Sequence, residues 1–83
     1  GWDVLGSSCI QLKDWNCAEK SLSRALEIAP YQVSTYANLG TLAYLQENWG
    51  EAEEWWSRTL NLNPTHEYAT RGLKAIEERM DTP

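Results

Sequence analysis

Histidine, a versatile catalytic and metal-binding side chain, occurs once in this chain of 83 residues, as His66. It follows Pro64 and Thr65 at the start of a predicted helix, with no cysteine or second histidine at the spacing of metal ligands. The sequence also has no glycine-rich phosphate-binding loop. We therefore predict neither a metal site nor a cofactor.

The two cysteines, Cys9 and Cys17, fall on consecutive predicted helices and lack the C-x-x-C spacing of redox pairs. No recognisable secretion signal opens the chain. We therefore expect two buried, reduced thiols rather than a disulfide, and the cytoplasm as the location.

Three neighbouring glutamates, Glu51, Glu53 and Glu54, resemble the paired carboxylates of acid–base catalysts. They fall in the first turn of a predicted helix, where the helix dipole stabilises acids, and Glu54 can pair with Arg58 four residues later. These side chains therefore have a structural explanation, and we expect the chain not to be an enzyme.

The overall charge and hydropathy exclude other classes of partner. The net charge is −5 and the sequence pI is about 4.7, so phosphate backbones are repelled and no nucleic-acid partner is expected. No run approaches the roughly 18 apolar residues of a membrane span. We therefore expect no membrane partner either.

A repeat of 34 residues organises the elements that carry these side chains. Residues 2–30 align without a gap with residues 36–64, with nine identities in 29 positions. The identical pairs are Leu5/Leu39, Gly6/Gly40, Trp15/Trp49, Ala18/Ala52, Glu19/Glu53, Ser23/Ser57, Arg24/Arg58, Leu26/Leu60 and Pro30/Pro64. Such self-similarity is typical of helical solenoids.

Each copy contains two segments with helical spacing of apolar residues, which predict helices at 2–12, 15–28, 32–46 and 49–62. Asp14 and Asn48 are predicted N-caps, and Asn48 with Glu51 has the spacing of a capping box. A fifth helix, at 65–80, is predicted to begin at a Thr65 cap and to close the array with a polar face. Lys74 stands where Gly40 stands in the second copy, so we expect no further helix to pack closely there.

These residues resemble the tetratricopeptide repeat family, whose pattern includes an aromatic residue, Leu-Gly, Ala and Pro in 34 residues. Trp2, Leu5-Gly6, Ala18 and Pro30 match it in the first copy, as do Tyr36, Leu39-Gly40, Ala52, Trp56 and Pro64 in the second. The resemblance implies an all-α fold of antiparallel helix-turn-helix repeats: repeat one at 1–31, repeat two at 32–64 and a capping helix at 65–80. The RNA-binding pentatricopeptide repeats are a minor alternative that fits these positions less well.

In the family, the first helices of successive repeats line a concave groove that binds a peptide. Carried over by position, the predicted groove residues are Asp3, Ser7, Ile10, Gln11, Ala37, Asn38, Thr41, Tyr44, Leu45, Tyr68 and Arg71. Tyr44 is the best single anchor, although partial core burial is an equal alternative. Some family members hold a peptide carboxylate with a five-residue clamp. Only Asn38 matches the clamp here, so the resemblance argues against that activity.

The sequence thus predicts a non-enzymatic interaction module that binds a peptide or helix in its groove, within a larger scaffold or adaptor. The alternative is a structural, oligomerisation or spacer segment, or a minimal engineered repeat, with an empty groove. We expect Trp55, aligned with Ser21, to pack on the capping helix rather than form a contact site. Trp2, Val4 and Leu5 border an uncovered edge, through which we expect a weak homodimer.

Overall fold

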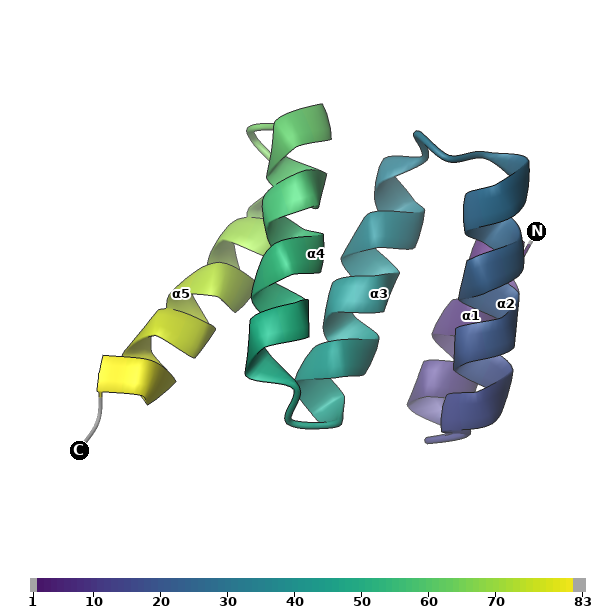
Figure 1. Ribbon diagram of the computed structural model, residues 1–83, viewed down its shortest axis with the longest axis horizontal. Coiled ribbons are helices and arrows are strands. Elements are labelled where there is room, and N and C mark those ends of the chain that lie inside the picture. The colour runs from purple at the N-terminus through teal and green to yellow at the C-terminus, as the bar shows by residue number, and fades with distance from the viewer. Residues whose placement is uncertain (1, 82–83) are drawn as a thin grey trace.

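The computed structural model describes residues 2–81, with side chains from Val4 to Arg79, and folds into five α-helices. They are α1 (Trp2–Gln11), α2 (Trp15–Ile28), α3 (Val33–Leu45), α4 (Trp49–Leu62) and α5 (Glu67–Asp81). No strand forms within this described range. The helices follow one another as antiparallel neighbours, as Figure 1 shows, and span 38 × 26 × 16 Å. The all-α repeat architecture is therefore confirmed.

The α1–α2 and α3–α4 turns close in the same way, 34 residues apart. Lys13 and Glu47 both adopt the left-handed conformation, with φ of 61° and 63°. The next amide in each turn donates back to the carbonyl five residues earlier, from Asp14 to Cys9 and from Asn48 to Ala43, at 2.9 Å. These bonds satisfy helix-terminal carbonyls that would otherwise lack partners. The turns therefore keep the geometry of a glycine cap although neither contains glycine.

The predicted caps are only partly correct. Asp14 caps α2, since its Oδ1 accepts a hydrogen bond from the Cys17 amide at 3.2 Å. Asn48 occupies the equivalent position before α4 but makes no side-chain cap bond, so the predicted capping box is wrong. Thr65 does not cap α5 either, because its amide and hydroxyl both bond to Asn63 Oδ1.

His66 caps α5 instead. Its Nδ1 accepts a hydrogen bond from the Ala69 amide at 3.2 Å, and α5 begins one residue after it, at Glu67. His66 is half-buried rather than exposed. Because Nδ1 accepts this bond, the neutral imidazole carries its proton on Nε2.

The close approach of paired helices explains the repeated glycines. Ala18 and Ala52 are fully buried, and a Cβ at Gly6 would lie 2.7 Å from Leu22 Cδ2. A Cβ at Gly40 would overlap the indole of Trp56. Both glycines are therefore at helix contacts.

Trp56 is the central packing residue of α3, α4 and α5. Its side chain is 2% exposed, and its Nε1 donates to the Ala37 carbonyl at 3.1 Å. A Cβ at Gly72 of α5 would also overlap the indole, from the side opposite α3. Close packing at α5 thus uses Gly72 rather than position 74, where the repeat alignment would put a glycine.

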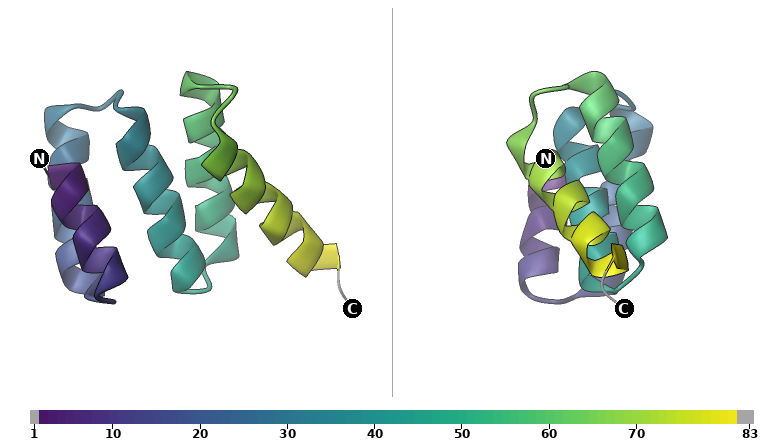
Figure 2. Two further views of the ribbon diagram at one scale, coloured as in Figure 1. Left: turned by 180° about the vertical axis from the view of Figure 1, so that it is seen from behind. Right: turned by 90° about the vertical axis from the view of Figure 1, so that its left-hand side faces the viewer.

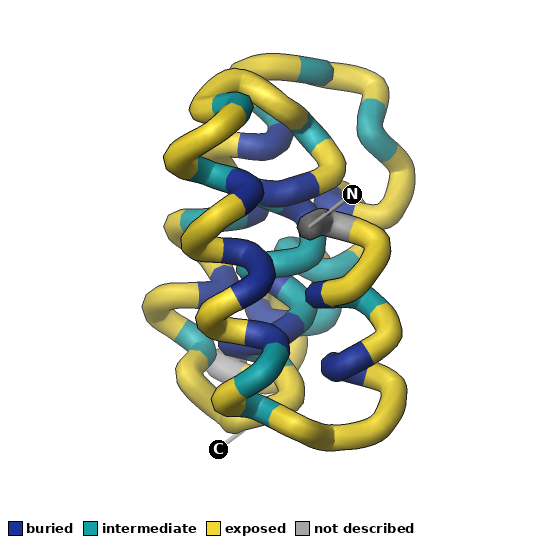
Figure 3. The backbone as a smooth tube through the Cα atoms, turned by 90° about the vertical axis from the view of Figure 1, so that its right-hand side faces the viewer, coloured by how far each residue is buried: buried dark blue, intermediate teal, exposed yellow. Residues whose placement is uncertain are grey.

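The core has two parts, whose residues are among the buried segments coloured dark blue in Figure 3. The first contains Cys9, Ile10, Ala18, Leu22 and Leu42. The second contains Ala43, Ala52, Trp56, Ala69 and Ile76. Leu42 belongs to α3 but is buried with the residues of α1 and α2, so it joins the two hairpins.

The cysteines form a Cys9–Cys17 disulfide with Cα atoms 5.8 Å apart, and the structure contains no free cysteine. The expectation of two reduced thiols is therefore wrong. The reason is geometric: the tight turn brings the last turn of α1 beside the first turn of α2, within the Cα separation that a disulfide spans.

Candidate functional site

A groove of about 800 Å³ lies over α3, between α1 and the start of α5. The left view of Figure 2 shows these segments on one face of the array. The residues that line the groove are Ser7, Ile10, Gln11, Lys13, Trp15, Ser34, Ala37, Asn38, Thr41, Leu45, His66 and Tyr68. The first helices of the two repeats and the first turn of α5 thus form one concave surface.

Eight of the predicted groove residues lie in this lining. They are Ser7, Ile10, Gln11, Ala37, Asn38, Thr41, Leu45 and Tyr68. The helical period explains the grouping on α3, where Ala37, Asn38, Thr41 and Leu45 recur at three- and four-residue spacing on one face. Whether these side chains bind a partner stays a prediction.

Three predicted positions are elsewhere or not described. The Tyr44 ring packs at 5.0 Å from Trp49 and 5.6 Å from Trp56, so this half-buried side chain belongs to the core. Arg71 is absent from the groove lining and lies 3.9 Å from Glu67 as an exposed ion pair. The Asp3 side chain lies outside the described residues.

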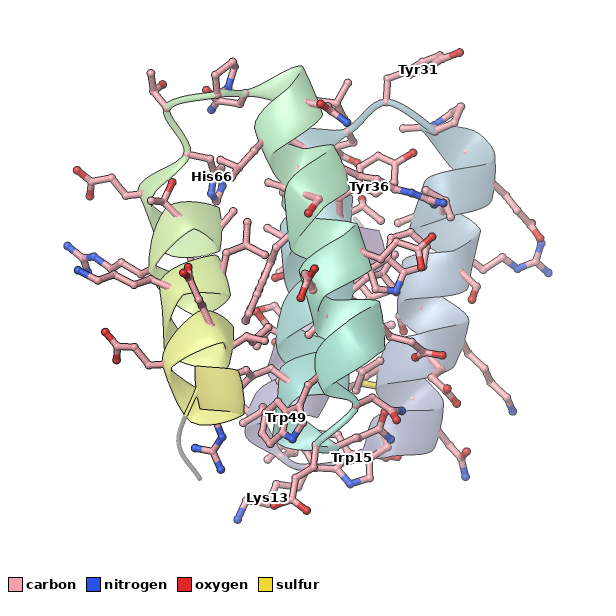
Figure 4. The ribbon with its side chains drawn as sticks, turned by 60° about the vertical axis from the view of Figure 1, so that its left-hand side comes forward. Lys13, Trp15, Tyr31, Tyr36, Trp49 and His66 are labelled. Atoms are coloured by element: carbon pink, nitrogen blue, oxygen red, sulfur yellow. A yellow bond between two sulfur atoms is a disulfide. The ribbon has the colours of Figure 1, made fainter. Side chains whose placement is uncertain are left out.

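Four lining residues were not predicted: Lys13, Trp15, Ser34 and His66. Ser34 could have been found, since it precedes Asn38 by one helical turn. Lys13, Trp15 and His66 lie in or next to the inter-helix turns, where helical periodicity gives no guidance. In Figure 4, Lys13 and Trp15 lie together near one end of the array, and His66 lies near the other.

The groove combines a polar wall with apolar positions. Ser7, Gln11, Ser34, Asn38 and Thr41 provide hydroxyl and amide groups. Leu45 and Tyr68 are 48% and 55% exposed, which is high for large apolar side chains. Thr41 donates to the Ala37 carbonyl at 3.0 Å. This mixture of apolar and hydrogen-bonding groups suits a peptide better than a small charged substrate.

A second hollow, of about 750 Å³, lies on the opposite side of α3 between α2 and α4. Its floor includes Leu39 and Leu42, and its walls are rich in charged side chains. Trp55 also lines it. The Trp55 ring lies 5.9 Å from that of Tyr36 on α3, and Arg58 stacks over it at 5.1 Å. Trp55 therefore packs within its own repeat, where we expected packing on the capping helix.

Among the residues that the structure describes, no three His, Cys, Asp or Glu side chains gather as metal ligands would. Nor is any helix in this range long and apolar enough to cross a membrane.

Comparison with known proteins gives sequence relatives but no matching family model. The chain is 35% identical over 71 residues to the tetratricopeptide repeat-containing protein trd-1 of Caenorhabditis elegans, an alignment covering 86% of this chain. It is 38% identical over 71 residues to the protein O-mannosyl-transferase Tmtc1 of Drosophila melanogaster, with 78% of this chain covered. It is 40% identical over 73 residues to Tmtc2 of the same organism, with 81% covered.

The matched segments are 9%, 8% and 7% of these three relatives, so the chain spans less than a tenth of their length. The names of Tmtc1 and Tmtc2 refer to O-mannosyl-transferase activity, and both proteins are much longer than this chain. What the chain shares with its relatives is a repeat segment, and its structure shows two helical hairpins related by 34 residues and followed by one further helix. The chain belongs to the tetratricopeptide repeat family.

Proposed function

We propose that this chain is a non-enzymatic protein-interaction module that binds a peptide or helix of a partner in the groove over α3. The observation that carries the proposal is the groove itself, where exposed Leu45 and Tyr68 lie among hydrogen-bonding side chains of α1 and α3. The relatives are far longer than this chain, which supports a role as one part of a larger scaffold or adaptor.

Peptide selection followed by NMR mapping tests this function. Peptides selected from a random display library are titrated into the ¹⁵N-labelled chain. We expect the largest shift changes along α1, α3 and the first turn of α5. Thr41→Arg places a long cation on the groove floor and should abolish binding. Ser57→Arg adds the same charge at an exposed position of α4 outside both hollows and should leave binding unchanged. Shift changes confined to the α2–α4 hollow would reject the groove as the site.

A second role, self-association, is favoured by the exposed apolar residues near the start of α1. Val4 is 64% exposed and Leu5 is 45% exposed, and Ile28, at the same end of the α1–α2 hairpin, is 68% exposed. Burying such a patch against a second copy would stabilise a weak symmetric dimer. The Trp2 side chain, predicted to contribute, lies outside the described residues.

The cytoplasmic location stays a prediction, and the Cys9–Cys17 disulfide weighs against it. Disulfides persist in oxidising compartments and are rare where glutathione keeps thiols reduced. We therefore favour an oxidising compartment for this segment of the parent protein.

A further inference from the structure

One end of the groove combines a cation with exposed apolar surface. At the end formed by the α1–α2 turn and the end of α3, the lining residues are Gln11, Lys13, Trp15 and Leu45. Leu45 is 48% exposed and Trp15 is half-buried, so both leave apolar surface open to a ligand. We call these four residues the Lys13 subsite.

Lys13 is the only lysine or arginine in the described lining, and none of the described lining residues is an aspartate or glutamate. The ion pairs in the described part of the chain are Arg24–Glu27, Arg58–Glu54 and Arg71–Glu67, and none involves Lys13. The described acidic side chains therefore lie outside the groove lining, and none of them pairs with the Lys13 ammonium, which is available to a ligand.

The turn holds Lys13 in place at the groove end. The Lys13 amide donates to the Ile10 carbonyl at 3.0 Å, and the following Asp14 amide donates to the Cys9 carbonyl at 2.9 Å. The disulfide also ties Cys9 to α2 beside this turn. The backbone that carries the cation is thus fixed before a ligand binds, which lowers the ordering cost of binding.

We infer that the Lys13 subsite binds a carboxylate next to a large apolar side chain of the partner. The apolar side chain lies on Trp15 and Leu45, while the carboxylate accepts hydrogen bonds from the Lys13 ammonium and the Gln11 amide. A lysine or arginine at the same place would meet an ammonium and no described carboxylate, so it is disfavoured. The carboxylate is the side chain of an Asp or Glu within the partner peptide. This inference rests on the groove being a peptide site.

Matched peptides test the charge preference by fluorescence anisotropy. The probes are short, labelled Ser/Gly peptides with a central Trp-Leu-X, where X is Glu, Gln or Lys and the C-terminus is amidated. A fourth probe has X as Gln and a free C-terminal carboxylate at that residue. We expect the Glu probe to bind about threefold more tightly than the amidated Gln probe, as for one exposed ion pair. A preference shown only by the probe with the free C-terminus would overturn the assignment to an Asp or Glu side chain. The preference should shrink as salt is raised.

A charge-matched pair of variants separates Lys13 from the overall charge. Lys13→Gln should remove the preference and leave the affinity of the amidated Gln probe unchanged. Lys20→Gln removes the same charge from the opposite hollow and should keep the preference. Equal losses in both variants would assign the effect to net charge and overturn the inference.

The outcomes also separate this inference from the proposed function. Groove binding by the amidated Gln probe with no preference for a carboxylate, or tighter binding of the Lys probe, would overturn the inference while the groove remains a peptide site. Failure of every probe and of every display-selected peptide to bind would reject the proposed function itself.

Discussion

At the scale of single residues, Trp56 shows how the repeat glycines work. Its indole lies between Gly40 of α3 and Gly72 of α5, where a Cβ on either glycine would overlap the ring. The neighbouring aromatic rings of Tyr44 and Tyr68 lie 5.6 and 6.1 Å away. One large side chain therefore sets the separation of three helices, and its space depends on residues that have no side chain.

A pair of glycine substitutions tests this packing. Gly40→Leu should lower the free energy of unfolding by about 1–3 kcal/mol, because the new side chain overpacks the α3–α4 contact. Gly50 is the control, since no atom lies within 4 Å of a Cβ built there. Gly50→Ala should stabilise by about 0.5 kcal/mol through helix propensity. Urea denaturation measures both, and a more stable Gly40→Leu variant would show that position 40 is not a close contact.

At the scale of the elements, the disulfide joins α1 to α2 at the turn that carries Lys13. The two cysteines are eight residues apart in sequence, so the bond closes a short loop. Loop-closure entropy predicts that such a crosslink stabilises the folded state by about 2.5 kcal/mol. Cys9 is also a core residue, with 4% exposure, so the crosslink is anchored within the packing of the first hairpin.

Reduction should therefore destabilise the chain by about 2.5 kcal/mol, measured as a lower urea midpoint at equal slope. The Cys9→Ser/Cys17→Ser variant controls for the reductant, and its midpoint should not respond to it. Two reactive thiols in oxidised, unfolded protein, together with coincident denaturation curves, would contradict the disulfide.

The helices of this fold could be predicted from the sequence more fully than their caps. Periodicity and the 34-residue repeat predict the five helices, with α5 starting two residues later than expected. The caps were harder to predict, because Asp14 and Asn48 align in the repeat but only Asp14 makes its bond. Capping depends on side-chain geometry at a turn, which helical periodicity does not predict.

The groove residues could likewise be predicted on helix faces but not in turns. Positions on the helix faces, such as Ser7, Asn38 and Thr41, follow from helical spacing and the family resemblance. Tyr44 lies one position outside that face and packs into the core with Trp49 and Trp56. Lys13 and His66 enter the groove from turns whose path depends on how the hairpins pack together, which local sequence does not encode.

At the scale of the whole molecule, the two core clusters meet through Leu42, which α3 contributes to the first hairpin. Val4 and Leu5, near the start of α1, are exposed in this arrangement. These two residues give the first hairpin an exposed apolar edge. The C-terminal side is different, because Lys74, Glu77 and Arg79 give α5 an exposed polar surface.

Sedimentation equilibrium from micromolar to millimolar concentration tests pairing through this edge. We expect a monomer–dimer equilibrium that the Val4→Ser/Leu5→Ser variant abolishes, since it removes apolar surface that pairing would bury. Leu62→Ser alters a residue 41% exposed at the end of α4 and should leave the equilibrium unchanged. A single monomer mass for the unmodified chain at all concentrations would reject the dimer.

The hydrogen bond from Trp56 to the Ala37 carbonyl has a spectroscopic consequence. Ala37 lines the groove, whereas the indole that bonds to it is 2% exposed in the core. The bond connects the groove floor to a proton that solvent reaches only when the fold opens. The indole N–H proton should therefore exchange slowly with deuterium, and its NMR resonance should shift when a ligand contacts Ala37. Trp56 is thus a built-in reporter, by which occupancy of the groove can be followed without a label on either partner.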